Sequence, residues 1–167
     1  MKLNILLVGL IFFISCQTKT AQEVTTSFPQ GINPVEKTDQ EWQSELTAME
    51  YKVLRKAGTE RQGTGDLLHN KEEGVYTCRG CSLPLFKSET KFNSGTGWPS
   101  YYEPYNEVNV EEDTDYKLGY ARTEVHCVRC KGHLGHVFPD GPPPTGLRYC
   151  INSVSLDFEP SEEGMDK

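Results

Sequence analysis

The chain of 167 residues contains no run of lysine and arginine, and its formal net charge is −7. A nucleic-acid-binding surface needs clustered basic side chains that neutralise phosphates. We therefore expect no nucleic-acid partner. Hydrophobic residues make up only 36% of the chain, whereas glycine occurs 15 times and proline 10 times. Such a polar, turn-rich composition favours a mainly β domain over a helical bundle.

The sequence also lacks an apolar run long enough to span a bilayer. The apolar stretch Leu3 to Ile14 follows Lys2, as in a secretory signal peptide. It ends at Ser15-Cys16, which resembles the cleavage box of bacterial lipoproteins, where the cysteine is lipidated. Ordinary signal-peptide cleavage beside an incidental cysteine is the alternative. Both interpretations predict export, to the periplasm or cell envelope, and the first adds a lipid anchor through Cys16.

The rest of the chain divides by composition into three parts. Residues 17–37 are rich in Thr, Gln and Pro and are predicted to form a flexible tether after the signal segment 1–16. The folded domain is expected over residues 38–158. Residues 159–167 are mostly acidic and are expected to form a loose tail.

Two short helices are predicted at the start of the domain. The first is capped at Thr38 or Asp39 and runs to about residue 46. Thr47 and Glu50 have the spacing of a capping box for the second, which is expected to run to Ala57 and to be stopped by Gly58. The apolar anchors of both helices are Trp42, Leu46, Val53 and Leu54.

From residue 74 onward the pattern is one of strands and turns. Apolar and polar residues alternate or mix, as in half-buried antiparallel strands. The strand candidates are residues 75–77, 83–86, 108–110, 118–125 and 147–158.

Four of the six cysteines form two Cys-X-X-Cys pairs, Cys78 with Cys81 and Cys127 with Cys130. A two-residue spacer lets both thiolates of one turn face the same ion, so two pairs predict a tetrahedral zinc site. Four thiolates leave no open coordination position, and the predicted zinc, one per chain, is structural.

Two alternatives for the cysteine pairs remain, because an exported protein meets an oxidising environment. The pairs could form two disulfides, or one pair could be a redox motif. Gly80 and Gly132 favour tight metal-binding turns. A small domain with two short helices also needs a stabilising cross-link of this kind.

Cys150 is then the free thiol of the folded part. In a strand, Arg148 and Asn152 lie two residues to either side and point to the same face as Cys150. The arginine would favour the thiolate, and such a polar row suits a reactive cysteine. The alternative is a buried, inert packing residue.

His133 and His136 follow the second cysteine pair directly. Histidines are often structural, but two of them in one short segment make a role in proton transfer plausible. Trp98 lies in the loop Gly95-Thr96-Gly97-Trp98-Pro99. It is either a core residue or the rigid wall of a binding pocket.

Together these motifs resemble the B-type methionine sulfoxide reductases, over roughly residues 38–158. The resemblance implies two antiparallel β-sheets with short N-terminal helices and the structural zinc site. The matching motifs are Gly58-Thr59-Glu60, Cys78-X-X-Cys81, Pro84-Leu85-Phe86, Ser94-Gly95-Thr96-Gly97-Trp98-Pro99-Ser100, Cys127-X-X-Cys130, Gly132-His133-Leu134-Gly135-His136-Val137-Phe138-Pro139-Asp140-Gly141-Pro142 and Arg148-Tyr149-Cys150-Ile151-Asn152-Ser153.

The resemblance also implies roles for individual residues. Cys150 is the nucleophile that attacks methionine R-sulfoxide, free or in oxidised proteins and peptides, and becomes a sulfenic acid. Trp98 holds the substrate methyl group, and Phe138 adds an apolar wall. The residues that activate Cys150 or bind the sulfoxide oxygen are His133, His136, Arg148 and Asn152.

One position departs from a common pattern of that family. Many members carry a second, resolving cysteine where this chain has Thr96. We therefore expect an external thiol, from a thioredoxin-like partner or a small molecule, to reduce the Cys150 sulfenic acid.

Three other functions compete with this interpretation. A zinc-knuckle interaction module explains the cysteine pairs but not the row around Cys150. A thiol-disulfide oxidoreductase would use one Cys-X-X-Cys pair and bind no zinc. A zinc hydrolase fits least, because no His/Glu site with an open coordination position is visible in the sequence.

Overall fold

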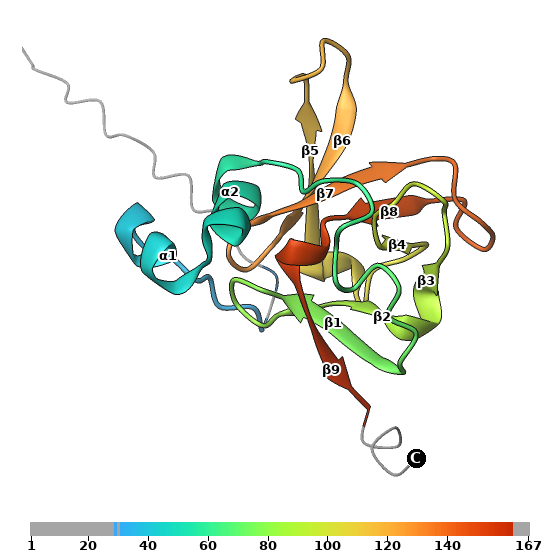
Figure 1. Ribbon diagram of the computed structural model, residues 1–167, viewed down its shortest axis with the longest axis horizontal. Helices are drawn as coiled ribbons and strands as arrows, with labels where there is room; N and C mark the ends of the chain where they lie inside the picture. The colour runs from blue at the N-terminus through green and yellow to red at the C-terminus, as the bar shows by residue number, and fades with distance from the viewer. Residues whose placement is uncertain (1–28, 30, 162–167) are drawn as a thin grey trace, which may run out of the picture.

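The computed structural model describes residue 29 and residues 31–161 (Figure 1). The predicted signal segment with Cys16, most of the predicted tether and most of the acidic tail lie outside the described residues. Within that described part, no helix has the length and apolarity needed to cross a membrane.

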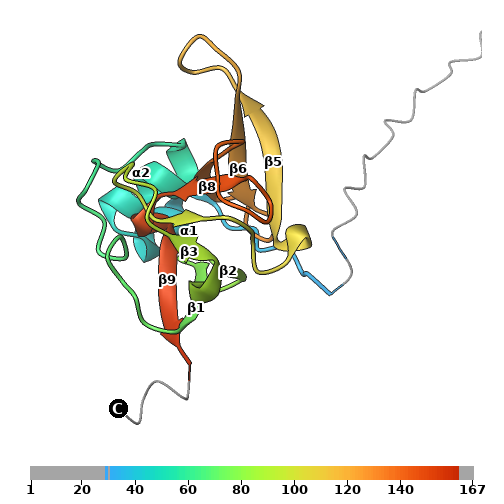
Figure 2. The ribbon, with the colours of Figure 1, turned by 90° about the vertical axis from the view of Figure 1, so that its right-hand side faces the viewer.

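The described residues form two helices and two antiparallel sheets, as the sequence predicts. One sheet has the order β2-β1-β9 and the other β3-β4-β8-β7-β6-β5. In Figures 1 and 2 both helices lie on one side of the strands, and the β5–β6 hairpin projects from the body. The elements are α1 Asp39–Glu45, α2 Ala48–Lys56, β1 Gly74–Cys78, β2 Pro84–Lys87, β3 Lys91–Phe92, β4 Ser100–Tyr101, β5 Val110–Asp115, β6 Arg122–Cys127, β7 His133–Phe138, β8 Arg148–Ile151 and β9 Leu156–Pro160.

Both helices begin as predicted, each with a complete capping box. Thr38 with Glu41 caps α1, and Thr47 with Glu50 caps α2. The end of α2 differs from the prediction, because Ala57 rather than Gly58 adopts the left-handed conformation, with φ of 47°. The predicted anchors Trp42, Val53 and Leu54 are buried, and Leu46 is partly buried.

Three strand predictions need correction. Residues 107–109 form a 3₁₀ turn, so β5 begins only at Val110. Residues 116–121 form the tip of the β5–β6 hairpin, so β6 begins at Arg122. The single strand expected over residues 147–158 is two strands in different sheets, β8 and β9, separated by the 3₁₀ turn Ser153–Ser155.

The domain is longer at both ends than predicted. Ile32 and Val35, expected in the tether, pack against the core, and the Val35 amide donates to the carbonyl of Arg129. At the other end, Glu159 and Pro160 pair with β1. The two sheets meet through aromatic side chains, with the rings of Tyr76 and Tyr101 5.2 Å apart.

The register of the six-stranded sheet gathers polar residues on one face. Directly paired residues of antiparallel strands lie on the same face. Cys150 on β8 pairs with Ser100 on β4 and with His136 on β7, and His136 pairs with Glu124 on β6. We call this side of the sheet the polar face. The opposite side carries the core residues Val125, Val137, Tyr149 and Ile151.

A β-bulge in β7 extends the polar face toward its edge. His133 and His136 are three residues apart, so a regular strand would turn them to opposite faces. The register shifts between Val125 and His126, and His126 pairs with His133. One extra residue in β7, Leu134, therefore returns His133 to the side of His136, with ring centroids 5.6 Å apart.

Candidate active site and metal centre

The two Cys-X-X-Cys pairs form turns of matching geometry. In the first, the Ser82 amide donates to the Cys78 carbonyl; in the second, the Lys131 amide donates to the Cys127 carbonyl. Ser82 and Lys131 have φ of 57° and 58°, and they are the left-handed residues that close the two turns. Each turn therefore presents two sulfurs toward the other turn.

Gly80 and Gly132 lie in or beside these two turns. Neither has a positive φ among the described glycines. A Cβ at Gly132 would lie 2.9 Å from the Leu54 side chain, and one at Gly80 would lie 3.4 Å from the Cys130 sulfur. Gly132 therefore allows close packing against Leu54, whereas the space at Gly80 would admit a Cβ at ordinary contact distance.

The four sulfurs are arranged as a metal ion requires. All lie within 4.8 Å of one another, with Cys78 to Cys130 at 3.6 Å and Cys81 to Cys127 at 3.5 Å. Zn–S bonds of about 2.3 Å in a tetrahedron separate the sulfurs by about 3.8 Å. A disulfide needs about 2.05 Å, and all five described cysteines are free thiols. Hydrogen bonds from Cys127 lower the pKa of both Cys81 and Cys130.

Cys150 lies at a separate place, on β8 in the middle of the polar face. Its side chain opens onto a small cavity of about 130 Å³. Trp98 and Phe138 are the aromatic members of the lining. The other lining residues are Thr59, Arg122, Gly135, His136 and Asn152. The structure thus brings the predicted nucleophile and both predicted substrate-binding residues together, and Trp98 belongs to a pocket wall rather than to the core.

Polar groups contact the Cys150 thiol from two sides. The Thr96 hydroxyl lies 3.8 Å from its sulfur and also forms a hydrogen bond with the Ser94 hydroxyl. Burial raises the pKa of the Cys150 thiol; the Thr96 hydroxyl and then Arg148 act to lower it. The net direction is opposite to the one expected from Arg148 alone, because burial outweighs the arginine.

Arg148 forms a bidentate salt bridge with Asp140. Its Nε and one terminal nitrogen donate to the two carboxylate oxygens of Asp140, each at 2.9 Å. Its guanidinium also stacks over the Phe138 ring, 4.5 Å from the centroid. These hydrogen bonds lower the pKa of Asp140. Arg148 therefore fixes the Phe138 wall as well as contributing charge.

Asn152 lines the cavity, but it does not continue a strand row with Arg148 and Cys150. β8 ends at Ile151, and the Asn152 amide turns inward. Its oxygen accepts from the Glu60 amide at 3.0 Å, and its nitrogen donates to the Leu134 carbonyl at 2.9 Å. The Glu60 carboxylate in turn accepts from the backbone of residues 153 and 154. These hydrogen bonds of Asn152 and Glu60 hold residues 152–154 in a turn outside the sheet.

His136 is the histidine of the cavity. Its Nε2 lies 2.9 Å from the carboxylate of Asp115, which also pairs with Arg122. A hydrogen bond from the Lys117 backbone, followed by the one from His136, holds the pKa of Asp115 well below its usual range. Burial lowers the pKa of His136. A neutral His136 therefore carries its proton on Nε2 and presents Nδ1 as an acceptor.

His133, the other predicted catalytic histidine, is placed differently. It is not part of the cavity lining. Its Nδ1 faces the Glu124 carboxylate at 2.5 Å, and its ring packs edge-on against His126. Burial lowers the pKa of His133 to about 4. His133 therefore lies beside His136 on the polar face, with ring centroids 5.6 Å apart, but outside the lining of the cavity.

Several residues of this site were missed from the sequence. Asp115 and Arg122 face each other across the β5–β6 pair, and no local spacing connects them to Cys150. Thr59 and Asp140 fall inside the motifs that carry the family resemblance. Their positions in those motifs indicate that they lie near the site, but not what they do there. The sequence singles out Thr96 only as the residue at the position of a resolving cysteine, and does not indicate its contact with the Cys150 sulfur.

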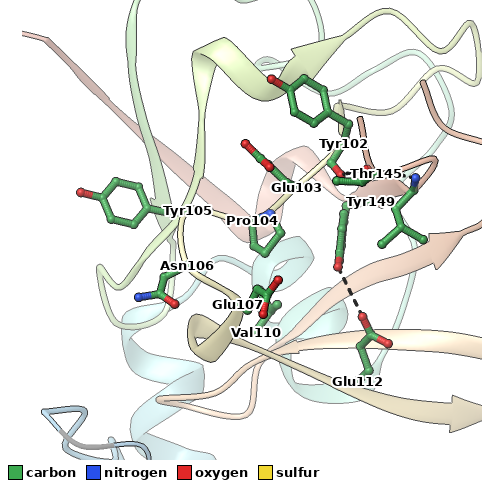
Figure 3. A pocket seen from close by; sticks show the side chains of 11 residues that line it. Tyr102, Glu103, Pro104, Tyr105, Asn106, Glu107, Val110, Glu112, Thr145 and Tyr149 are labelled. Carbon is green, nitrogen blue, oxygen red and sulfur yellow. Dashed lines mark hydrogen bonds between the residues drawn. The ribbon is translucent and has the colours of Figure 1, made fainter. Parts of the chain in front are cut away.

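Larger clefts exist elsewhere in the described part of the chain, but no cysteine lines them. One of about 580 Å³ is lined mainly by residues 102–107 with Tyr149, Thr145 and Glu112 (Figure 3). The Tyr149 hydroxyl points to the Glu112 carboxylate at 3.4 Å, on the side of β8 away from Cys150. Size therefore does not identify the reactive site, whereas the thiol chemistry does.

Comparison with known proteins agrees with this geometry. A SelR domain is matched over residues 46–160. The peptide methionine sulfoxide reductase MsrB of Thiobacillus denitrificans is 56% identical over 126 residues, 75% of this chain and 96% of that protein. The protein of the same name from Methanosarcina barkeri is 58% identical over 132 residues, 78% of this chain and 92% of its own. That from Leptospira interrogans is 52% identical over 125 residues, 75% and 95% respectively.

Proposed function

Because the chain belongs to the B-type methionine sulfoxide reductase family, we propose that it reduces the R epimer of methionine sulfoxide at Cys150. Its class, an oxidoreductase acting on methionine sulfoxide, follows from the family. The substrate is methionine sulfoxide, free or in oxidised proteins and peptides. One observation carries the assignment of the site: the Cys150 thiol opens onto a cavity walled by an indole and a phenyl ring, with His136 beside it.

The cavity supports binding of the methyl sulfoxide end of the side chain. Trp98 and Phe138 offer apolar surfaces that suit a methyl group. Arg148 stacks on Phe138 and holds that ring in place. Sulfur and oxygen of the substrate then face Cys150 and the polar lining. Epimer choice rests on the family alone.

The first chemical step is transfer of the oxygen atom to Cys150. His136 accepts the thiol proton on Nδ1, and Asp115 stabilises the resulting imidazolium. The thiolate attacks the sulfoxide sulfur, and His136 returns the proton to the oxygen. The attack forms a bond between the two sulfurs. The hydroxyl then moves to the Cys150 sulfur as that bond and the sulfur–oxygen bond of the substrate break, so methionine leaves and Cys150 is left as a sulfenic acid. Atoms balance, because the thiol hydrogen ends on the transferred oxygen.

The second step requires an external thiol. The Thr96 hydroxyl lies 3.8 Å from the Cys150 sulfur, and a hydroxyl cannot form a disulfide. The other described cysteines converge on the proposed metal site. A first external thiol condenses with the sulfenic acid and releases water; a second thiol reduces the mixed disulfide and restores Cys150. The reductant is a thioredoxin-like protein or a small thiol.

The four-cysteine cluster is proposed to hold one structural zinc ion. The sulfur spacing fits a tetrahedral ion, and four thiolates leave no position for substrate. Bound there, zinc would tie the turn after β1 to the turn after β6 and so join the two sheets. Metal analysis of purified protein should give one tightly bound zinc per chain.

We also propose export and lipidation at Cys16. Lys2, the apolar run 3–14 and the Ser15-Cys16 pair support this. One acyl chain alone binds membranes only marginally, so stable anchoring requires more than one chain at Cys16. Replacement of Cys16 by Ser should move the protein from the membrane fraction to the soluble fraction of cells. An unchanged distribution would contradict the proposal.

Turnover of the separate R and S epimers of a blocked methionine sulfoxide tests the function. The full chain is assayed with dithiothreitol, as wild type, Cys150→Ser and Cys16→Ser. We expect reduction of the R epimer alone, lost in Cys150→Ser and retained in Cys16→Ser, which removes a thiol remote in sequence from the domain. Absence of turnover in folded, zinc-loaded wild type would point to a non-enzymatic module.

A further inference from the structure

Three potential metal ligands converge at the edge of the polar face, away from the cysteine cluster. They are the Glu124 carboxylate and the imidazoles of His126 and His133. Glu124 and His126 are two residues apart on β6, so they point to the same face. The bulge in β7 brings His133 opposite His126. Their ligand atoms all lie within 4.8 Å of one another.

Two of these atoms are buried and lack hydrogen bonds. His133 is 3% exposed, and its Nδ1 lies 2.5 Å from Glu124 Oε1. The two atoms nevertheless do not form a hydrogen bond of normal geometry, and the other contact of Glu124 Oε1 stays within the cluster, to His126 Nε2. A carboxylate that only oriented the imidazole would accept an aligned hydrogen bond. An imidazole nitrogen beside a carboxylate oxygen that a second imidazole also contacts is a donor set for a cation.

The spacing suits a metal ion with short bonds. Glu124 Oε1 is 3.2 Å from His126 Nε2. Metal–nitrogen and metal–oxygen bonds of about 2.0–2.2 Å place neighbouring ligand atoms about 3–3.5 Å apart. Small rotations of Glu124 and of the partly exposed His126 ring bring all three atoms into that range.

The charge around the cluster also favours a cation. Asp113 on β5 pairs in register with Glu124, and Glu111, which is ion-paired with Lys131, pairs in register with His126. Arg122, the basic residue two positions before Glu124 on β6, is engaged by Asp115. The cluster therefore lies in a region of excess negative charge.

We propose that Glu124, His126 and His133 form a second metal site, which binds one divalent transition-metal ion such as Zn²⁺, Co²⁺ or Ni²⁺. Two imidazoles and one carboxylate suit ions of this class better than Ca²⁺ or Mg²⁺. Three protein ligands leave at least one coordination position open to water. The proposal does not rest on the reductase function, because none of the three residues lines the Cys150 cavity.

Cobalt binding to the full-length, zinc-loaded protein tests this site. A Cys150→Ser background removes the remaining free thiol of the domain, and Co²⁺ is titrated while visible absorption and zinc release are followed. We expect one Co²⁺ bound per chain without zinc release and without the thiolate-to-cobalt charge-transfer band that cysteine ligation produces. His126→Ala should weaken binding at least about tenfold, since a ligand is lost.

A matched control and a second variant complete the test. His69→Ala removes a histidine outside the cluster and should bind Co²⁺ as the parent does. Should His126→Ala fail to fold, as judged by circular dichroism, His126→Asn takes its place. Absence of Co²⁺ binding to the parent, sulfur ligation in its spectrum, or equal affinity in the parent and the His126 variant would each overturn the proposal.

Discussion

Cysteine occurs in two environments in this domain, and they differ in what surrounds the sulfur. In the four-cysteine cluster every sulfur faces another sulfur. Cys150 instead faces a hydroxyl and a small aromatic cavity, with Arg148 and His136 nearby. The first arrangement has no place for a substrate, whereas the second leaves one side of the thiol open. The same side chain is thus directed to structure or to chemistry by its neighbours.

The largest expected difference between the two environments concerns folding. Cys127→Ser removes one of the four proposed zinc ligands. The variant should bind no zinc and should be unfolded at 37 °C, since structural zinc contributes on the order of 10 kcal/mol to the free energy of folding. Cys150→Ser should keep zinc and a melting temperature within about 4 °C of wild type. Thermal unfolding by circular dichroism, with zinc analysis, measures both. A zinc-loaded Cys127→Ser protein of normal stability would contradict this contrast.

The next effect concerns proton transfer at Cys150. Asp115→Asn removes the carboxylate that holds His136 and should lower kcat/KM about 100-fold, the range typical of an impaired acid–base group. KM should change little, whereas the melting temperature should fall, because the buried carboxylate that pairs with Arg122 loses its charge. Asp113→Asn is the control, because Asp113 is an exposed carboxylate on the same strand. Equal rates for the two variants would show that His136 does not need Asp115.

A smaller effect concerns the pKa of the thiol. Burial already raises the pKa of Cys150, and Thr96 opposes that rise. The reactive thiolate forms only as pH rises through this pKa, so activity should increase with pH above neutrality. Thr96→Val removes a hydrogen bond to sulfur and should move the profile to higher pH, with a loss of roughly three- to tenfold at pH 7.

The pH profile of kcat/KM measures that change. Thr123→Val, an exposed threonine on β6, is the control and should leave the profile in place. A Thr96→Val profile that coincides with wild type would remove Thr96 from any role in activating Cys150.

The smallest expected change in rate comes from giving Cys150 a neighbouring thiol. In Thr96→Cys the second sulfur would start near the 3.8 Å contact that the hydroxyl now makes. Gly95 and Gly97, with φ of 72° and 84°, flank it in the loop. A single turnover without added thiol should then leave a disulfide between residues 96 and 150. Thiol counting and peptide mapping detect it; wild type should retain a sulfenic acid instead.

The two environments also differ in how far the sequence predicts them. The cysteine cluster depends on two local turns, and the spacing of the ligands within each turn is visible in the sequence. The helices follow equally local capping boxes. Cys150 and Arg148 followed from the alternation of a short strand, which holds as far as Ile151.

The rest of the site depends on contacts between distant segments. Asn152 departs from the strand because it binds residues near positions 60 and 134. Asp115 reaches His136 through the register of three strands. His133 shares the polar face with His136 only because of a bulge in β7, which residue spacing alone does not indicate. Such long-range pairing determines orientation, and one sequence without its register contains too little information to predict it.

The bulge at Leu134 has a consequence for how this protein can change over evolution. It makes the number of residues in β7, as well as their identity, a requirement for function. With the bulge kept, insertion of one residue between His133 and His136 would turn the two rings to opposite faces and send one of them into the aliphatic layer between the sheets. Substitutions can accumulate along this strand one at a time, whereas a change in its length would have to be compensated at once in the strands on either side.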